Sequence, residues 1–177
     1  MASASSEVLL DAAGIGRTLE RLARELRASL PEGVSLGLVG IRSRGEVLAE
    51  RLEPLLAGLG VQEIETGALD ITLYRDDLPE LGPKALVRST EIEFDINGLY
   101  LVLVDDVLYT GRSVRSALDA LVDLGRPKAI RLMVLVDRPG RELPIQADFV
   151  GVRVTAADVP VSVHLTESDG VDEVLIG

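Results

Sequence analysis

The 177-residue sequence contains no cysteine and only one histidine, His164. The first absence excludes disulfides and thiol catalysis, and the second excludes a histidine-rich metal site. No run of eighteen uninterrupted apolar residues occurs, although 47% of the residues are hydrophobic, so no membrane span is indicated. No basic-then-apolar signal is visible at the start, and we expect residues 1–6 to form a disordered leader.

The charge balance is acidic, with 29 acidic residues against 18 basic ones and a formal net charge of −11. This balance argues against a surface built for nonspecific nucleic-acid binding, although it leaves room for a local basic patch. The length fits a single domain, residues 1–177, which is long enough to bury a substantial core.

The most informative stretch is residues 101–113, Leu-Val-Leu-Val-Asp-Asp-Val-Leu-Tyr-Thr-Gly-Arg-Ser. Its four leading apolar residues predict a strand that is buried on both faces. Asp105 and Asp106 follow, and residues 110–113 then form a tight turn that carries hydroxyl groups. An amphipathic helix comes next, with one apolar stripe made of Val114, Ala117, Leu118, Leu121 and Val122.

This order of elements predicts a particular ligand. Backbone N–H groups of residues 110–113 would converge at the positive end of the helix, where an anion binds favourably. Gly111 lets the backbone approach closely, and Ser113 can cap the helix or donate its hydroxyl to the anion. Two nearby carboxylates suit a vicinal diol, because hydrogen bonds to a charged acceptor contribute roughly 1.5–3 kcal/mol each. A diol beside a phosphate describes a ribose 5-phosphate; the plainer alternative is a buried strand with a solvated Asp-Asp turn.

Residues 104–113 resemble the phosphoribosyl-pyrophosphate (PRPP) motif of the phosphoribosyltransferases, with Ser113 in place of the commoner threonine. The turn lacks the glycine patterns of nucleoside-triphosphate and dinucleotide binders. The resemblance implies the α/β type I phosphoribosyltransferase fold: an open, mostly parallel sheet flanked by helices, with a small hood and a flexible β-loop. It also implies that Asp105 and Asp106 are catalytic and contact Mg²⁺. The substrate contacts that it implies in the turn are Val107, Leu108, Tyr109, Thr110, Gly111, Arg112 and Ser113.

A second strand, residues 34–41, also ends in a polar loop ahead of a helix pattern at residues 47–59. Ligand sites in open α/β sheets lie where strands end in this way. The loop residues suit pyrophosphate, because an arginine can grip it in a bidentate way. We assign a catalytic role to Arg42, and the further substrate contacts are Ser43, Arg44 and Gly45. A pair of plain surface arginines is the alternative. This loop resembles the pyrophosphate loop of the same family, which often carries a strained or cis peptide.

Residues 68–74 predict a strand, and residues 87–94 predict a returning strand after a charged loop interrupted by proline and glycine. A long polar excursion within residues 66–98 favours a mobile functional loop. Such a loop would close over the substrate and exclude water. Its candidate contacts are Arg75, as a catalytic residue, and Tyr74 and Arg88, as substrate-binding residues.

Residues 70–78, Asp-Ile-Thr-Leu-Tyr-Arg-Asp-Asp-Leu, resemble the flexible-loop block of the PyrR family of pyrimidine-operon regulators and uracil phosphoribosyltransferases. The similarity runs nearly end to end and is weakest at both termini and at residues 79–98. It implies PRPP and uracil as substrates, UMP and pyrophosphate as products, and Mg²⁺ as cofactor. It further implies a cytoplasmic enzyme that is at least a homodimer and that binds pyrimidine-operon leader RNA in response to UMP.

Residues 130–136 predict a buried strand that ends at Asp137 and Arg138. This region borders the nucleobase in the family, so the wall of the base site is expected to comprise Val136, Asp137 and Arg138. A plain ion pair at the strand end is the alternative. The usual Arg-Gly-His-Arg-Glu-Leu-Pro appears here as residues 138–144, Arg-Pro-Gly-Arg-Glu-Leu-Pro, and residues 152–157 lack a lysine and a proline of the family. These departures weaken the RNA interpretation and leave the base open, with a purine as alternative. An attenuator with little catalytic activity is the other alternative.

The first helix is predicted over residues 11–30 by an apolar stripe. Four arginines lie off that stripe and form either a solvated face or part of an RNA-binding surface: Arg17, Arg21, Arg24 and Arg27. Residues 149–154 and 159–165 predict late strands, with His164 on a polar face, followed by a solvated acidic tail at residues 167–173. A small sub-structure there would cap the base.

The implied reaction transfers the ribosyl C1 from pyrophosphate to a base nitrogen through a transition state that resembles an oxocarbenium ion. Asp105 and Asp106 would hold the diol and place negative charge near the developing cation. Mg²⁺ would bridge pyrophosphate and ribose oxygens, using waters rather than a protein cage. Because no histidine or cysteine lies nearby in the sequence, catalysis would depend on positioning and electrostatics.

Overall fold

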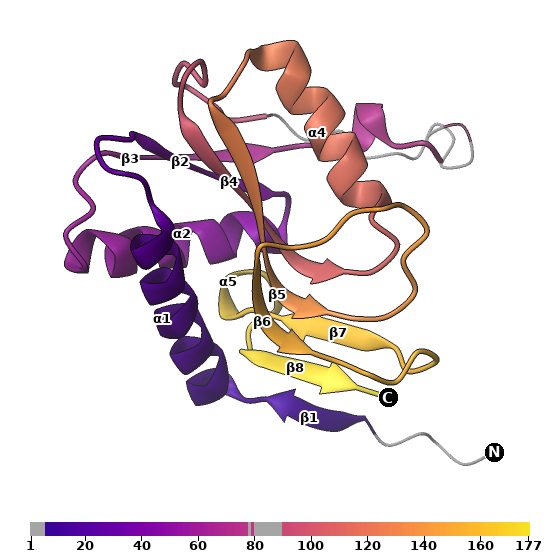
Figure 1. Cartoon of the computed structure of the whole chain (residues 1–177). Coiled ribbons are helices and arrows are strands. Elements are labelled where there is room, and N and C mark those ends of the chain that lie inside the picture. The colour runs from indigo at the N-terminus through magenta and orange to yellow at the C-terminus, as the bar shows by residue number, and fades with distance from the viewer. Residues whose placement is uncertain (1–5, 78, 80–89) are drawn as a thin grey trace.

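The computed structural model describes residues 6–77, 79 and 90–177. Its centre is a five-stranded, fully parallel sheet in the order β3-β2-β4-β5-β6 (Figure 1). The strands of this sheet are β2 (Leu36–Ile41), β3 (Ile64–Leu69), β4 (Tyr100–Leu108), β5 (Ala129–Asp137) and β6 (Phe149–Arg153). The acidic pair therefore lies within β4, on the central strand of the sheet, and not after its end as the sequence suggested.

Each face of the central sheet has its own core, because successive side chains of a strand point to opposite faces. On one face, α1 (Ala12–Ser29) and α2 (Arg44–Gly58) pack over residues such as Leu38 and Val102. On the other face, α4 (Arg112–Leu124) packs over residues such as Leu103 and Val134. The predicted α/β architecture, with helices on both faces of a parallel sheet, is confirmed.

A small antiparallel sheet forms the hood, in the order β1-β8-β7. Its elements are β1 (Glu7–Leu10), β7 (Val161–His164), α5 (Thr166–Asp169) and β8 (Glu173–Ile176). Because β1 pairs with β8, the first and last described segments of the chain lie side by side (Figure 1). The sequence predicted β7 but missed β1 and β8. Of the leader expected at residues 1–6, residues 1–5 lie outside the described residues.

The acidic tail is not merely solvated, which corrects the sequence-based expectation. Arg51 of α2 donates to a carboxylate oxygen of Glu167 at 2.9 Å and to the carboxylate of Asp172 at 2.8 and 2.9 Å. His164 contacts Glu173 at 3.1 Å through its Nδ1. The pairs of Arg51 tie the hood to α2, so these acidic residues have a structural role.

Two other sequence-based boundaries differ from the structure. The strand predicted at residues 68–74 ends at Leu69, and η1 (Thr72–Tyr74) follows. Asp70 explains this ending, because its carboxylate accepts hydrogen bonds from the backbone N–H and the hydroxyl of Thr72 and so closes a turn. Residues 87–89 of the expected returning strand lie outside the described residues, and the described part contributes a bridge between Glu91 and Ala68.

The apolar stripe of α4 is narrower than the sequence suggested. Val114, Ala117 and Leu121 are buried, whereas Val122 is 71% exposed. Val122 follows Leu121 directly and so points about 100° away from it around the helix. None of the described helices is long and apolar enough to cross a membrane.

The start of α2 lies directly against β4. A Cβ atom on Gly45 would overlap the carbonyl oxygen of Val104, so only glycine permits this approach without displacement. The contact brings the loop at residues 42–45 next to Asp105, whose Cα is also close to the same position. Packing thus sets the distance between the two predicted ligand loops.

The Arg51 cluster generates a prediction about stability. Replacing Arg51 with Met removes the partner of Asp172, whose pKa Arg51 holds below its usual range by hydrogen bonding. A lowered folded-state pKa stabilises the fold above the ordinary Asp value of about 4, and this contribution disappears as the pH falls through the lowered value. We expect Arg51→Met to reduce the free energy of unfolding by roughly 1–2 kcal/mol at pH 7, measured by urea titration.

The matched control is Arg115→Met, because Arg115 lies 4.0 Å from Asp119 in an exposed pair on α4. It should cost less than about 0.5 kcal/mol. Equal losses in the two variants at pH 7 would contradict a structural role for the Arg51 cluster.

Candidate active site

The acidic pair forms one wall of the candidate site. Asp105 is 8% exposed and Asp106 is half-buried. The backbone N–H of Asp106 donates to Asp105 Oδ1 at 2.9 Å, and that of Val107 donates to Asp106 Oδ1 at 2.8 Å. These bonds fix both carboxylates on the central strand.

Burial raises the pKa of Asp105 well above its usual range, and the negative charge of Asp106 raises it further. The ionised pair is therefore unfavourable in the protein alone. Donors or positive charge brought by a ligand would relieve this cost. Such a pair is suited to bind hydroxyl groups, a cation, or both.

The turn after β4 surrounds a cavity of about 130 Å³. Asp105 borders this cavity together with Val107, Leu108, Tyr109, Thr110, Gly111, Ser113 and Val114. The N-cap of α4 is Gly111, with φ of 92°, so Ser113 lies in the first helical turn and is not the N-cap. The structure thus brings Asp105 and the start of α4 to one cavity, and the N-terminal end of a helix is where an anion binds favourably.

Gly45, at the end of the loop of residues 42–45, lies against Val104 and Asp105, and the Arg42–Ser43 peptide of this loop is cis. Arg42 pairs with Glu46 at 2.9 Å and with Glu91 at 3.1 Å, and its side chain is only 14% exposed. Arg42 is therefore not a plain surface arginine. Arg44 instead turns to the hood, where it pairs with Asp169 at 2.8 Å.

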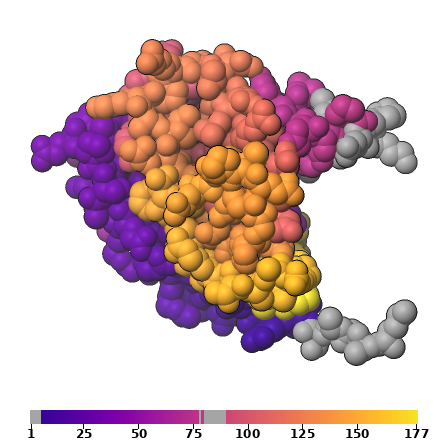
Figure 2. Space-filling view, turned by 45° about the vertical axis from the view of Figure 1, so that its right-hand side comes forward, coloured from indigo at the N-terminus to yellow at the C-terminus, as the bar shows by residue number. Residues whose placement is uncertain are grey.

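The segment after η1 lies beside α4 (Figure 2). Arg75 pairs with Asp77 at 2.7 Å, and together with Thr110 and Ser113 they border a second cavity of about 210 Å³. The hydroxyl of Tyr74 donates to Asp123 at 2.7 Å, near the far end of α4. This differs from the expectation that Tyr74 points at the substrate. Arg88 lies outside the described residues.

Two of the expected contacts have side chains in the core. Val136 is fully buried, and Leu108 is 2% exposed with its side chain packed in the α4 core. Leu108 nevertheless borders the cavity of about 130 Å³ together with Asp105, whereas Val136 is not among the described residues that line it. The predicted substrate contacts of these two residues stay predictions.

The ion pair between Asp137 and Arg138, which was the alternative to a base site at the end of β5, does not form. Asp137 pairs with Arg141 at 2.8 Å and with Arg153 at 3.8 Å, and not with Arg138. Arg138 lies over the Tyr109 ring at 4.1 Å and donates to the Ala157 carbonyl oxygen at 3.1 Å. The Nε atom of Arg138 is buried and lacks a hydrogen-bond partner among the described residues.

Sequence reasoning missed three residues that shape the site. Arg141 donates to the Tyr109 carbonyl oxygen at 2.6 Å and so ties the turn to Asp137. Glu142 and Asp76 contact Arg112 at 2.6 and 2.7 Å. Only the resemblance of residues 70–78 and 138–144 to family blocks pointed to these positions, and it gave them no role.

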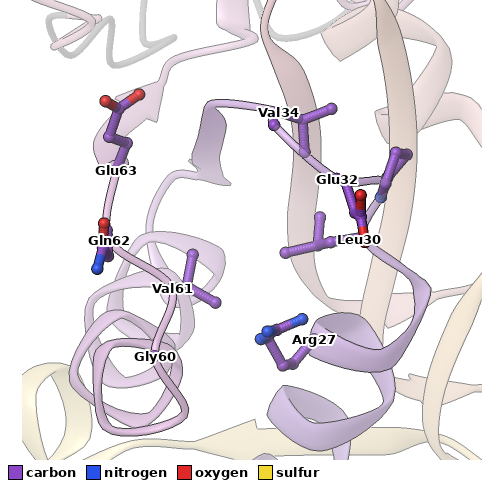
Figure 3. Close-up of a pocket in the computed structure, with 10 residues that line it drawn as sticks. Arg27, Leu30, Glu32, Val34, Gly60, Val61, Gln62 and Glu63 are labelled. Atoms are coloured by element: carbon purple, nitrogen blue, oxygen red, sulfur yellow. The ribbon is translucent and has the colours of Figure 1, made fainter.

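A larger cavity, of about 450 Å³, lies elsewhere (Figure 3). Residues 27 and 30–34 line one side of it and residues 60–63 the other, as Figure 3 shows. These segments lead into β2 and β3, so the cavity is at the amino ends of the strands. Ligands of parallel α/β sheets bind at the carboxyl ends, where the acidic pair lies. The smaller cavity therefore remains the candidate site.

The phosphoribosyl transferase domain family matches residues 5–168 of the chain. Solved structures with the same fold include the hypoxanthine phosphoribosyltransferase of Trypanosoma cruzi, with a TM-score of 0.73. That likeness covers 96% of this chain and 95% of that one at 15% identity, and it shows the fold alone. The fold and the match define the chain as a phosphoribosyltransferase.

Sequence relatives narrow this class. The bifunctional protein PyrR of Chloroflexus aurantiacus is 54% identical over 169 residues, which span 95% of this chain and 93% of the relative. The bifunctional protein PyrR of Pelotomaculum thermopropionicum is 53% identical over 169 residues, with the same coverage. The chain belongs to the PyrR family, and the resemblance noted in the sequence is confirmed.

The buried carboxylate generates the second prediction. The variant Asp105→Asn keeps an oxygen to accept the Asp106 N–H but carries no charge there. Since burial raises the pKa of Asp105, ionisation destabilises the fold above that raised value, and the penalty disappears as the pH falls to the ordinary value of about 4. We expect Asp105→Asn to increase the free energy of unfolding by on the order of 1 kcal/mol at pH 8.

Urea titrations at pH 8 and pH 4 test this expectation, with Asp119→Asn on the exposed face of α4 as control. The gain should shrink at pH 4, where the penalty for ionising Asp105 has largely disappeared. A loss of stability of Asp105→Asn at pH 8 would contradict the prediction that the ionised Asp105 carboxylate destabilises the fold.

Proposed function

We propose that this chain transfers the phosphoribosyl group of PRPP to uracil, giving UMP and pyrophosphate, as a cytoplasmic enzyme. The observation that carries the proposal is the shared cavity of Asp105 and the start of α4. A ribose 5-phosphate needs a pair of acceptors for its 2′ and 3′ hydroxyls and an anion site for its phosphate, one ribose length apart. The end of β4 and the turn that follows it supply both.

In the proposed reaction, the bond between ribose C1 and the pyrophosphate oxygen breaks and a bond from C1 to uracil N1 forms. Pyrophosphate leaves with the electron pair of the broken bond, and the proton of N1 passes to solvent water. Asp105 and Asp106 accept from the ribose hydroxyls and place negative charge beside the C1 cation. Arg42 and Ser43 would contact the leaving pyrophosphate, and Arg75, which borders a cavity together with Thr110 and Ser113, would contact the phosphate side of the substrate.

The donor set fits an ion that is held mainly by the substrate. No group of three or more His, Asp or Glu side chains in the described part of the chain is placed to share a metal. Asp105 and Asp106 would be the protein contacts of Mg²⁺, directly or through water. The ion supplies neutralisation of charge on the departing pyrophosphate. Its positive charge would also favour the ionised form of Asp105.

The base would lie between the ends of β4 and β5. Arg138, stacked on Tyr109, provides a donor in the buried Nε, and Asp137 provides an acceptor. Uracil presents two carbonyl oxygens and an N3–H, so one carbonyl oxygen and the N3–H can pair with a donor and an acceptor of this kind. We also infer assembly into at least a dimer, as the resemblance to the family implied.

The substrate prediction is a preference for uracil. We expect pyrophosphate release from PRPP to be at least about 100-fold faster with uracil than with hypoxanthine or guanine at equal concentration, because unpaired polar groups of a wrong base are costly.

The double variant Asp105→Asn, Asp106→Asn should reduce turnover at least about 1,000-fold and still fold. Preference for a purine would overturn the base assignment, and unchanged turnover in the double variant would overturn the site.

A regulatory role is the second candidate function, and the exposed arginines of α1 favour it. Arg21 donates to the carbonyl oxygens of Val150 and Gly151, and Arg27 donates to that of Leu59, so these two have structural partners. Arg17 and Arg24 are exposed and face outward from the same helix. Of the four arginines of α1 named above, these two are the ones that we propose contact RNA phosphates.

We therefore expect tight, UMP-enhanced binding of a pyrimidine-operon leader RNA in a filter-binding titration. The variant Arg17→Ala, Arg24→Ala should weaken it roughly tenfold or more and reduce the salt dependence by about two phosphates, with uracil turnover unchanged. Arg115→Ala on α4 serves as the control. No UMP-dependent binding by the unaltered protein would reject the regulator, and binding without turnover would favour an attenuator alone.

A further inference from the structure

Arg112, the first residue of α4, connects two segments that are distant in the sequence. Its Nε donates to Glu142 Oε2 at 2.6 Å, and its Nη1 donates to Asp76 Oδ2 at 2.7 Å. Asp76 belongs to the segment after η1, and Glu142 belongs to the loop between β5 and β6. One side chain thus bridges two loops across the end of the helix that faces the candidate phosphate site.

Both bridged segments also contact the phosphate turn or its helix. The backbone N–H groups of Glu142 and Leu143 donate to the Thr110 carbonyl oxygen at 2.9 and 3.1 Å. The segment of Asp76 is held on α4 by the hydrogen bond of Tyr74 to Asp123 at 2.7 Å. In Figure 2 this magenta segment lies beside the surface of α4. Arg112 therefore completes a frame around residues 110–113.

The charge arrangement argues against a direct phosphate contact by Arg112. Its Nε and Nη1 each donate to a carboxylate, and these hydrogen bonds raise the pKa of Arg112. One guanidinium stands against the two carboxylates of Asp76 and Glu142, so the cluster is net negative and repels a phosphate. Phosphate would then be bound by backbone N–H groups and hydroxyls of the turn, which need accurate positioning.

Stability alone does not account for the bridge. The three side chains are 39–53% exposed, and ion pairs exposed to this degree contribute little to the stability of a fold. Their effect is instead on geometry, because small displacements of binding groups reduce substrate affinity strongly. We propose that Arg112 is a positioning residue, which holds the Asp76 and Glu142 loops so that the turn between them is shaped for the PRPP 5′-phosphate. This inference rests on the proposed function and deepens it.

The experiment compares Arg112→Met, Arg112→Lys and the double variant Asp76→Asn, Glu142→Gln with the unaltered protein. We expect Arg112→Met to raise the KM for PRPP about tenfold, with kcat and the KM for uracil changed less than about twofold. The double carboxylate variant should raise the same KM about three- to tenfold. Arg112→Lys should restore little, because an ammonium group does not span two carboxylates as a planar guanidinium does. Arg115→Met is the control.

The carboxylate variant separates the proposal from a direct phosphate contact. If Arg112 gripped the phosphate, the neutral amides of that variant would free its donors and lower the KM for PRPP, and Arg112→Lys would keep most of the affinity. Either result would overturn the proposal. A fall of more than about 5 °C in the Tm of Arg112→Met, with both KM values raised, would show a general structural role and overturn it as well.

Calorimetric titration with ribose 5-phosphate makes the test independent of the base. If the unaltered protein binds ribose 5-phosphate but does not convert uracil, the proposed function fails while the affinities of the variants still decide the role of Arg112. Equal affinities of the unaltered protein and Arg112→Met would reject the positioning role. Loss of affinity in both the Arg112→Met and the carboxylate variants would support it.

Discussion

The structure depends on a carboxylate that is buried before any ligand is present. Asp105 lies on the central strand of a parallel sheet, next to Asp106, where burial and like charge both raise its pKa. An isolated chain would be more stable with an uncharged residue there. The unfavourable energy is useful only if a ligand supplies donors or positive charge at that point. The position of this pair therefore defines where binding energy can be gained.

The neighbouring loops are arranged around that pair by packing. Gly45 brings the start of α2 against the Val104 carbonyl group, and the Thr110 carbonyl oxygen accepts from two N–H groups of the loop after β5. Both contacts involve backbone atoms, so they fix the loops without depending on side-chain rotamers. Three loops from different parts of the chain consequently meet at the carboxyl end of β4. This arrangement suits the substrate that we propose, which has a diol and two separate phosphate groups.

Arginines near the site are already paired with carboxylates. Arg42 contacts Glu46 and Glu91, Arg44 contacts Asp169, and Arg112 contacts Asp76 and Glu142. An anionic substrate must compete with these carboxylates before it can use the guanidinium groups. Backbone N–H groups and a metal ion carried by the substrate avoid that competition. The acidic character of the chain is therefore compatible with an anionic substrate.

Local patterns predicted the centre of the molecule, because strand, acidic pair, turn and helix follow one another in residues 101–124. Long-range pairing was not visible locally: β1 pairs with β8 across the whole length of the chain, and each strand has only four residues. The hydrogen bond from the Tyr74 hydroxyl to Asp123 was not predictable from the local sequence either, because Asp123 lies in another element.

The departure from the family motif at residues 139–140 has a physical consequence that only the structure reveals. A Cβ atom on Gly140 would overlap the ring of Tyr109, and Gly140 has a φ of 125°, which disfavours other residues. The histidine usual at this position could not be accommodated with Tyr109 in its present place. Arg138 lies on the same ring at 4.1 Å and is thereby oriented at the end of β5. Glycine in place of the histidine thus leaves room for the Tyr109 ring and, on it, Arg138 beside the proposed base site. The change does not affect the residues that we propose to contact ribose and phosphate.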